Sequence, residues 1–534
     1  MPSVVAPDRR CRGGFAALLT RWLTAAAFLL VLGAPALPAL ADEFSDRLNN
    51  QFKSIAPDRR SDIVLVPLLA KLTDPPAGLS DPYQAALIPG SSAAFAEAAA
   101  WAQAEPQKAF FAGLEKVTGE KDWKKAYAWG QPYGTEGVDP ETIALRAYTD
   151  LGDPPLLARA NHMYLPMLDR ANVLVHIEAT RRLAAGEAGS ALDLLWRWLH
   201  FSRSMADRLF FAEVEWSFKT MLLTLERMRD IAYVDARADK QTLTADQTRD
   251  ILKERMIDRG GIIGLDRLRF PVGNEVGCEQ VVNRVFNRRG KANPAVFSPM
   301  LAESSSRTHP LRLFSETARW DSIADLHGND LETREALKNV AEGWYRRWQL
   351  KQWDPALKLR SDFEKLDTVK FAVVRVLVGD LSSLFELRIR LRVELGGTRV
   401  ALALNGFCIG QKGNFPRDIT AVRPAFVPSI DLDPLNRTEG SPYKFFVPVR
   451  DAIQDPNNPT VDHTLNVIPG GNFPSFSRRL NEEYFVLYSA GPDGDLDGAR
   501  RLTQMAEEDK ADYLIWPPIM GLLREKLVAD GALK

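Results

Sequence analysis

Residues 484–498 read YFVLYSAGPDGDLDG, and this stretch predicts a β-strand that runs directly into an acidic loop. Aromatic and β-branched side chains cluster at 484–488, and such side chains favour a strand. Asp493, Asp495 and Asp497 then follow at alternate positions. Carboxylate oxygens at this spacing are ligands of the kind that a hard cation such as Ca²⁺ takes in proteins. The stretch therefore predicts a calcium-binding loop whose metal ligands are these three aspartates.

Two other interpretations of the acidic loop can be compared with this one. The loop matches the first half of an EF-hand, but its twelfth position is Gln504, so the bidentate glutamate of that motif is missing. The remaining alternative is a solvent-exposed turn, for which Asp and Gly are the usual residues. No nucleophile or general base stands nearby in the sequence, so bound Ca²⁺ is expected to stabilise the loop.

The surrounding sequence predicts a small α+β domain over residues 398–534. A second strand is expected at 443–449, and the two strands would form a short antiparallel sheet. A helix is expected at 398–409, a long loop at 451–483, and two C-terminal helices at 503–512 and 519–529.

Upstream of this domain the sequence predicts a mainly α protein with a helical-hairpin array over residues 156–256. Apolar residues recur at helical spacing on both sides of a turn at 185–190, which predicts two antiparallel helices. A third helix is expected at 210–229, and the capping box Thr244-Ala-Asp-Gln247 begins a fourth. The hairpin resembles one tetratricopeptide unit, but no second copy follows at the repeat length of that family.

Three more segments complete the organisation. Residues 42–155 are expected to form an N-terminal helical region, and residues 257–328 an irregular excursion because Gly and Pro punctuate them. Residues 329–397 are expected to be helical again, with a break at Gly396-Gly397.

Residues 1–41 are expected to be a secretory signal peptide. A basic leader precedes a short apolar run at 22–32, and Ala39-Leu-Ala41 is a small-x-small cleavage site. The mature protein is therefore expected to be periplasmic or secreted, cleaved after Ala41, with no transmembrane segment. The formal net charge of −1, without any block of Lys or Arg, argues against a nucleic-acid partner.

Residues from about 385 to 500 resemble the globular half of type II secretion pseudopilins. The matching pieces follow one another in the same order, at Arg399–Leu404 with Phe407, Gly413–Pro416, Asp433-Pro434, Gly440–Tyr443 and Tyr488–Gly494. The wider stretch 165–500 is similar to a group of uncharacterised bacterial exported proteins in which a helical-hairpin array precedes such a pseudopilin-like domain. This resemblance implies a fold and a location rather than a reaction.

The resemblance also implies a ligand set. In the major pseudopilins the corresponding loop binds calcium through carboxylates and main-chain carbonyls, which here implies Asp493, Asp495 and Asp497, helped by the carbonyl of Ser489 or Leu496. This chain lacks the N-terminal assembly helix of a pilin, and a signal peptidase site replaces the prepilin site. Polymerisation in the manner of a pilin is therefore not expected.

His176 and His200 are the strongest catalytic candidates in the sequence. They lie almost equally far from the hairpin turn, so they could face each other, with Glu178 and Asp207 adding carboxylates to a metal site. The alternative is that both histidines are core residues, because they flank the apolar stripes. Carboxylate pairs such as Glu213 and Glu215 are expected to lie on solvated helix faces.

Two further groups have open interpretations. The aromatic residues of one helix and the linker after it are expected to form a buried seam, with an aromatic platform for a sugar or peptide as the alternative; they are Trp344, Tyr345, Trp348 and Trp353. Cys278 and Cys408 could form a disulfide after export, or remain buried thiols.

These observations favour an exported, non-enzymatic binding or assembly module with a Ca²⁺-stabilised C-terminal loop and a protein partner. The partner follows from the expectation that stacked helical hairpins present a concave surface to other proteins. One alternative is an exported metal-dependent hydrolase using His176 and His200. The other is a polymer- or glycan-binding protein that uses its tryptophans.

Overall fold

The computed structural model describes residues 43–257, 260–305, 313–451, 463–470, 473–481, 483–503 and 511–533. Residues Glu43–Lys534 gather into one compact unit. The largest apolar core of this unit includes residues from Leu65 to Leu522, so the segments predicted from the sequence share one core. The leader predicted at 1–41 lies outside the described residues.

The N-terminal region consists of short helices, as the sequence predicts. Two of them begin in the expected way, because the carboxylates of Asp81 and Asp139 accept the N–H of the second helical residue and Pro occupies the first position. The helices are α2 Glu43–Lys53, η1 Pro57–Arg59, α3 Ser61–Leu69, α4 Pro82–Leu87, α5 Ala93–Ala102, α6 Glu105–Val117 and α7 Pro140–Ala144. A short ribbon and a 3₁₀ turn close the region, namely β1 Thr149–Asp150, η2 Leu157–Arg159 and β2 Asn161–His162.

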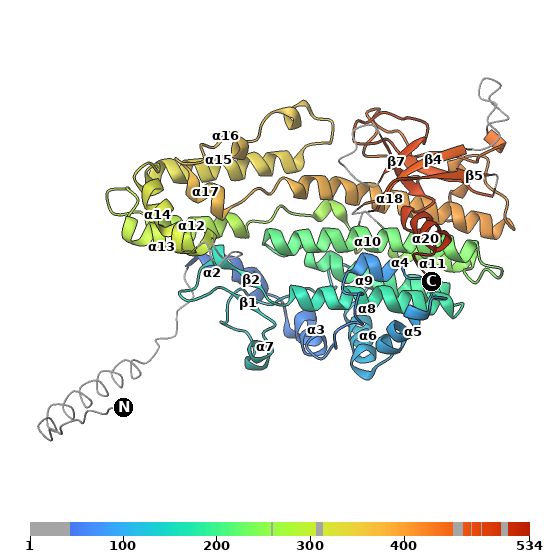
Figure 1. Cartoon of the computed structure of the whole chain (residues 1–534), viewed down its shortest axis with the longest axis horizontal. Coiled ribbons are helices and arrows are strands. Elements are labelled where there is room, and N and C mark those ends of the chain that lie inside the picture. The colour runs from blue at the N-terminus through green and yellow to red at the C-terminus, as the bar shows by residue number, and fades with distance from the viewer. Residues whose placement is uncertain are drawn as a thin grey trace, which may run out of the picture. The chain divides into compact units, whose positions relative to one another are not determined.

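The predicted hairpin is confirmed, with a turn at 185–187 between its two helices. The capping box at Thr244 also begins a helix as predicted. The elements are α8 Leu165–Ala184, α9 Ala188–Met205, α10 Phe211–Ala236, α11 Ala245–Asp250 and the π-helical turn η3 Ile251–Arg255. Helices α5 and α6 pack against α8 and α9 on the side away from α10 (Figure 1).

The prediction that residues 257–328 form an irregular excursion is wrong, because most of the described residues in this range are helical. The helices are η4 Leu265–Arg267, α12 Gly273–Val285, α13 Pro294–Ser305 and α14 Leu313–Ala324. Gly273 and Pro294 stand at first helical positions, where neither residue breaks a helix. A Cβ at Gly277 would lie 2.8 Å from the backbone nitrogen of Ala158, so this glycine allows two backbones to pack closely.

A helical arm follows and leads into the longest helix of the described chain. It comprises α15 Asp330–Gln349, η6 Pro355–Lys358, α16 Asp362–Lys365, α17 Ala372–Leu377 and α18 Ser383–Gly410. Helix α18 is continuous over 28 residues, so the predicted break at Gly396-Gly397 is wrong. A Cβ at Gly396 would lie 2.7 Å from the hydroxyl of Tyr443, and one at Gly397 would lie 2.6 Å from the side chain of Ile515. The two glycines therefore let the C-terminal sheet approach the helix.

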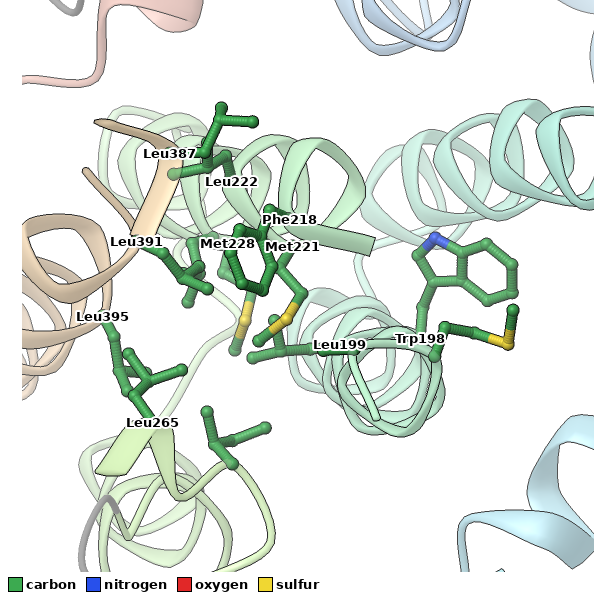
Figure 2. Packing of buried hydrophobic residues seen from close by; sticks show 14 of the residues in the cluster. Trp198, Leu199, Phe218, Met221, Leu222, Met228, Leu265, Leu387, Leu391 and Leu395 are labelled. Carbon is green, nitrogen blue, oxygen red and sulfur yellow. The ribbon is translucent and has the colours of Figure 1, made fainter. Parts of the chain in front are cut away.

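The core between helices α9, α10 and α18 is built from large apolar side chains. Figure 2 shows Leu199 of α9 and Met221 and Met228 of α10 between these helices, together with the α18 residues Leu387, Leu391 and Leu395. All of them are buried. None of the helices in the described ranges is both long enough and apolar enough to cross a bilayer.

The C-terminal sheet is larger than predicted, and it is mixed rather than antiparallel. In the described residues six strands follow the order β3-β6-β8-β7-β4-β5, and β7 is parallel to both of its neighbours. The elements are β3 Lys444–Phe446, β4 His463–Ile468, β5 Phe476–Leu480, β6 Val486–Ser489, β7 Arg501–Thr503, β8 Asp512–Trp516 and helix α20 Ile519–Ala529. Helix α18 packs against β6 and β8 (Figure 1).

Two of the predicted C-terminal elements need correction. The loop predicted at 451–483 contains strands β4 and β5, and the alternating burial of β4 is the pattern of a strand with one buried face. The helix predicted at 503–512 is bounded by strand residues at both ends, and residues 504–510 between them lie outside the described chain. Strand β8 is buried at every position, so its sequence lacks the alternation that would have distinguished it from a helix.

Candidate functional site

The three aspartates predicted as calcium ligands lie in the loop between β6 and β7. The carboxylate of Asp493 accepts the N–H of Asp495 at 3.1 Å, as in an ordinary Asp turn. The carboxylate of Asp495 lies 3.5 Å from the guanidinium of Arg437. Asp497 is exposed, and its N–H donates to the carboxylate of Asp512 at 3.1 Å. Within the described chain, no group of three His, Cys, Asp or Glu side chains stands ready to hold a metal ion.

Asp512, the first residue of β8, is the member of this acidic group that the sequence analysis missed. It is 1% exposed, and its carboxylate also accepts the N–H of Ala499 at 2.7 Å. Burial raises the pKa of Asp512 to about 6, and the charges of Asp497 and Asp493 act in the same direction, against its hydrogen bonds. The structure thus places the loop that contains Asp493 and Asp497 beside the carboxyl of Asp512, at the start of the interior strand β8. Asp512 lies 15 positions beyond Asp497, so loop spacing gave no signal for it.

The acidic loop is packed against the helical arm. A Cβ at Gly494 would lie 2.5 Å from the ring of Trp353, and Gly494 has a positive φ of 77° that suits glycine. The indole N–H of Trp353 donates to the carbonyl of Leu435 at 3.0 Å. The guanidinium of Arg437 lies 5.5 Å from the centre of the Trp353 ring. The position of this loop therefore depends on the linker after α15 as well as on the sheet.

A cavity of about 300 Å³ lies beside the loop, between the helical arm and α18. Three separate parts of the chain line it: the arm from α15 to α16, the first turns of α18, and the sheet with its loops. Pro492 of the acidic loop and Tyr513 of β8 form part of its wall. The cavity and the acidic loop are therefore neighbours.

Tyr513, which lines the cavity, also belongs to a buried network of ion pairs and hydrogen bonds. The hydroxyl of Tyr513 donates to the carboxylate of Glu394 at 2.8 Å, and Glu394 also accepts from the guanidinium of Arg229. Arg390 of α18 faces Tyr513 and Glu394, which raise its pKa against the effect of burial. Glu394 and Arg229 are nearly inaccessible. These contacts tie α10, α18 and β8 together through charge-assisted hydrogen bonds.

Glu226 belongs to the same buried network, and its carboxyl group is partly protonated near neutral pH. Burial raises its pKa to about 7, and the charge of Glu394 adds to this effect, while Arg229 opposes it. Its carboxylate accepts the N–H of Met520 at 2.9 Å, at the start of α20. One turn further along α10, Asp230 accepts from Arg524 at 2.8 and 2.6 Å. Helix α20 is thus attached to α10 through buried polar groups.

A second buried ion group lies at the N-terminal end of α10, around Glu213. Its carboxylate accepts from Arg208 at 2.6 Å, from Tyr133 at 2.8 Å and from Tyr164. Burial alone would raise the pKa of Glu213, but chiefly the charge of Arg208 holds it down at about 2. The prediction of a solvated face is therefore wrong for Glu213, and its satisfied hydrogen bonds indicate a structural role.

His176 and His200, the candidate metal ligands of the hydrolase hypothesis, have different surroundings. His176 is fully buried, with Arg227 and Asp230 of α10 nearby, and burial lowers its pKa to about 3. His200 is buried with its ring near the backbone of Thr118, and burial lowers its pKa to about 4. Both rings are therefore neutral at physiological pH.

The aromatic and cysteine side chains behave mostly as core residues. Trp344 and Trp348 are buried and pack against Phe270 with ring centres 5.7 and 5.4 Å apart, which confirms the predicted seam. Cys278 and Cys408 are buried free thiols in the described structure. Burial raises the pKa of Cys408 to about 12, so this thiol is unreactive at neutral pH.

The chain matches no protein-family model, no curated protein and no solved structure.

Proposed function

We propose that the protein is an exported, non-enzymatic binding or assembly module whose loop Asp493–Asp497 is stabilised by Ca²⁺. The observation that carries the proposal is the position of Asp493 and Asp497 beside the buried Asp512 at the start of β8. Like charges held together raise the free energy of the folded state, and a divalent cation relieves that repulsion.

The proposed Ca²⁺ ligands follow from the contacts that each carboxylate already makes. Asp493 and Asp497 would supply carboxylate oxygens, and main-chain carbonyls of the loop would complete a shell of oxygen ligands. Asp495 would have to leave Arg437, a contact between two exposed side chains that costs little to break. Asp512 would act mainly through its charge, because its oxygens accept the N–H groups of Asp497 and Ala499.

The arrangement around the loop supports a structural rather than a catalytic use of the ion. The loop joins two strands of the sheet and packs on Trp353 of the arm, so an ion there would fix the sheet and the arm together. The helix that contains Arg399–Leu404 lies against β6 and β8, which also supports a pseudopilin-like C-terminal domain. Export rests on the signal peptide proposed at 1–41.

Thermal unfolding of the mature protein in CaCl₂ and in EGTA tests the calcium site. At a Ca²⁺ concentration of about 100 Kd, binding adds about 2.7 kcal/mol to the free energy of unfolding. For a unit of this size that corresponds to a rise in Tm of about 3 °C. The rise should be larger at pH 7 than at pH 5, because Asp512 is largely protonated below its pKa of about 6.

Variants identify the ligands. Asp493→Ala and Asp497→Ala should each abolish the rise in Tm caused by Ca²⁺, whereas Asp325→Ala, at an exposed aspartate of the helix α14–α15 turn, should keep it. An equal response to Mg²⁺, or a response that survives in Asp493→Ala, would contradict the proposed site.

A further inference from the structure

We infer that the cavity between the α15–α16 arm and α18 is a binding site for a small organic cation, an ammonium or guanidinium group carried on an apolar body. The inference goes beyond the proposed function and does not require that the loop binds Ca²⁺. The volume of about 300 Å³ is at the lower end of the range for ligand sites in proteins.

The apolar part of the lining would take the body of the ligand. It comes from the arm, from α18 and from the segment before β3, and consists of Trp344, Leu357, Phe385, Ile389 and Leu435. Because these residues belong to different elements, the cavity exists only when the arm is folded onto α18. A mostly apolar wall with a few charged groups is the usual composition of a small-molecule site.

The two arginines of the lining are already engaged by the protein. The guanidinium of Arg347 donates to the carbonyls of Leu357 and Leu359. Arg390 faces Tyr513 and Glu394 on the inner side of the cavity, so its charge is balanced from within. Neither arginine is therefore available to attract an anionic ligand without losing these partners.

The lining also holds three carboxylates, and the charges of Arg347 and Arg360 partly balance that of Glu364. Asp380 accepts the N–H of Ser382 at 2.9 Å, and Glu364 accepts from Ser361, but within the described chain neither carboxylate forms an ion pair. Glu386 is exposed at the rim and has neither a hydrogen bond nor an ion pair in the described residues. Hydrogen bonds from the backbone and the hydroxyl of Ser361, and then the charges of Arg347 and Arg360, lower the pKa of Glu364.

The charge of the cavity therefore favours a cation. Asp380 and Glu386 line it without an ion pair in the described chain, and Asp493 follows its wall residue Pro492 in the sequence. An excess of one sign of charge in a cleft concentrates ligands of the opposite sign.

Titration of the mature protein with three probes of the same shape tests the charge preference. The probes are phenethylamine, which is a cation at pH 7, the neutral 2-phenylethanol, and the anionic 3-phenylpropanoate. Tryptophan fluorescence and calorimetry should show saturable binding of the amine, much weaker binding of the alcohol, and none of the acid. The titrations are run in EGTA and again in CaCl₂, so failure of the calcium site and failure of this site give different results.

Variants connect the binding to the cavity. Asp380→Asn and Glu386→Gln should each weaken binding of the amine by up to about fivefold, since exposed ion pairs contribute about 0.2–1 kcal/mol. Asn at position 380 can still accept the N–H of Ser382, so the start of α18 is kept. Ile389→Trp should fill the cavity and abolish binding, and Glu97→Gln on the remote helix α5 should leave it unchanged.

Three results with the probes and with Ile389→Trp would overturn the inference. These are no saturable binding of the amine, equal binding of the amine and the alcohol, and amine binding that persists unchanged in Ile389→Trp while circular dichroism shows that variant folded. A fold-change in Glu97→Gln equal to that in Glu386→Gln would likewise exclude the cavity as the site.

Discussion

Glu226→Gln is expected to stabilise the protein at alkaline pH and to leave it nearly unchanged at acid pH. Glu226 lies in α10, 7% exposed, close to Glu394 and Arg229. Gln has the same shape, can accept the N–H of Met520 as Glu226 does, and carries no charge. The substitution therefore removes a buried charge and preserves the packing.

The magnitude follows from the pKa. A carboxyl whose pKa is raised in the folded state contributes full stability below its unfolded pKa and loses that contribution as the pH rises through its folded pKa. For Glu226 this interval runs from 4.5 to about 7. At about 1.36 kcal/mol per pKa unit, the wild type loses about 3 kcal/mol of stability across the interval. The Gln variant does not, so its advantage at pH 8 is about 3 kcal/mol.

Thermal unfolding measured at pH 4.5 and at pH 8 checks this expectation. An advantage of about 3 kcal/mol corresponds to a Tm about 3 °C higher for the variant at pH 8, in a unit of this size. Glu97→Gln, on the exposed surface of α5, controls for the loss of one charge. If the difference in Tm between Glu226→Gln and the wild type is the same at both pH values, Glu226 does not titrate in the folded protein as argued.

Three further outcomes follow from the buried contacts. Glu213→Gln leaves Arg208 buried without its counter-charge, so it should lower the free energy of unfolding by about 3–5 kcal/mol in urea melts at pH 7. The pKa of Glu213 is depressed to about 2, so this loss should shrink as the pH falls from 4.5 towards 2. Gly397→Ala places a Cβ 2.6 Å from Ile515 and should cost about 1–3 kcal/mol in the same melts, whereas an unchanged midpoint would show that the sheet is not held tightly against α18. The two buried cysteines should react with a thiol reagent only after unfolding, and a reducing agent should leave the Tm unchanged; a shift would mean that they are bridged.

Local sequence patterns were sufficient to predict the helices whose apolar stripe or capping residues can be recognised in the sequence. The hairpin of α8 and α9 follows from apolar spacing on both sides of a short turn, and α11 and α15 begin at capping boxes that satisfy their first N–H groups. The pairing of strands near 443 and 486 also follows from local β propensity. Gly396-Gly397 misled the prediction because close packing decides the role of these glycines, and Pro294 did so because it occupies the first position of a helix.

The candidate sites likewise combine features that the sequence predicts with features that only the tertiary structure shows. The sequence by itself determined the acidic loop, because Asp493, Asp495 and Asp497 are neighbours along the chain. Only the tertiary structure decided that Asp512 stands beside them and that a cavity opens between the arm and α18. Burial and charge balance depend on segments that are far apart in sequence, and it is these two quantities that set the pKa of a carboxyl and the sign of the ligand it would attract.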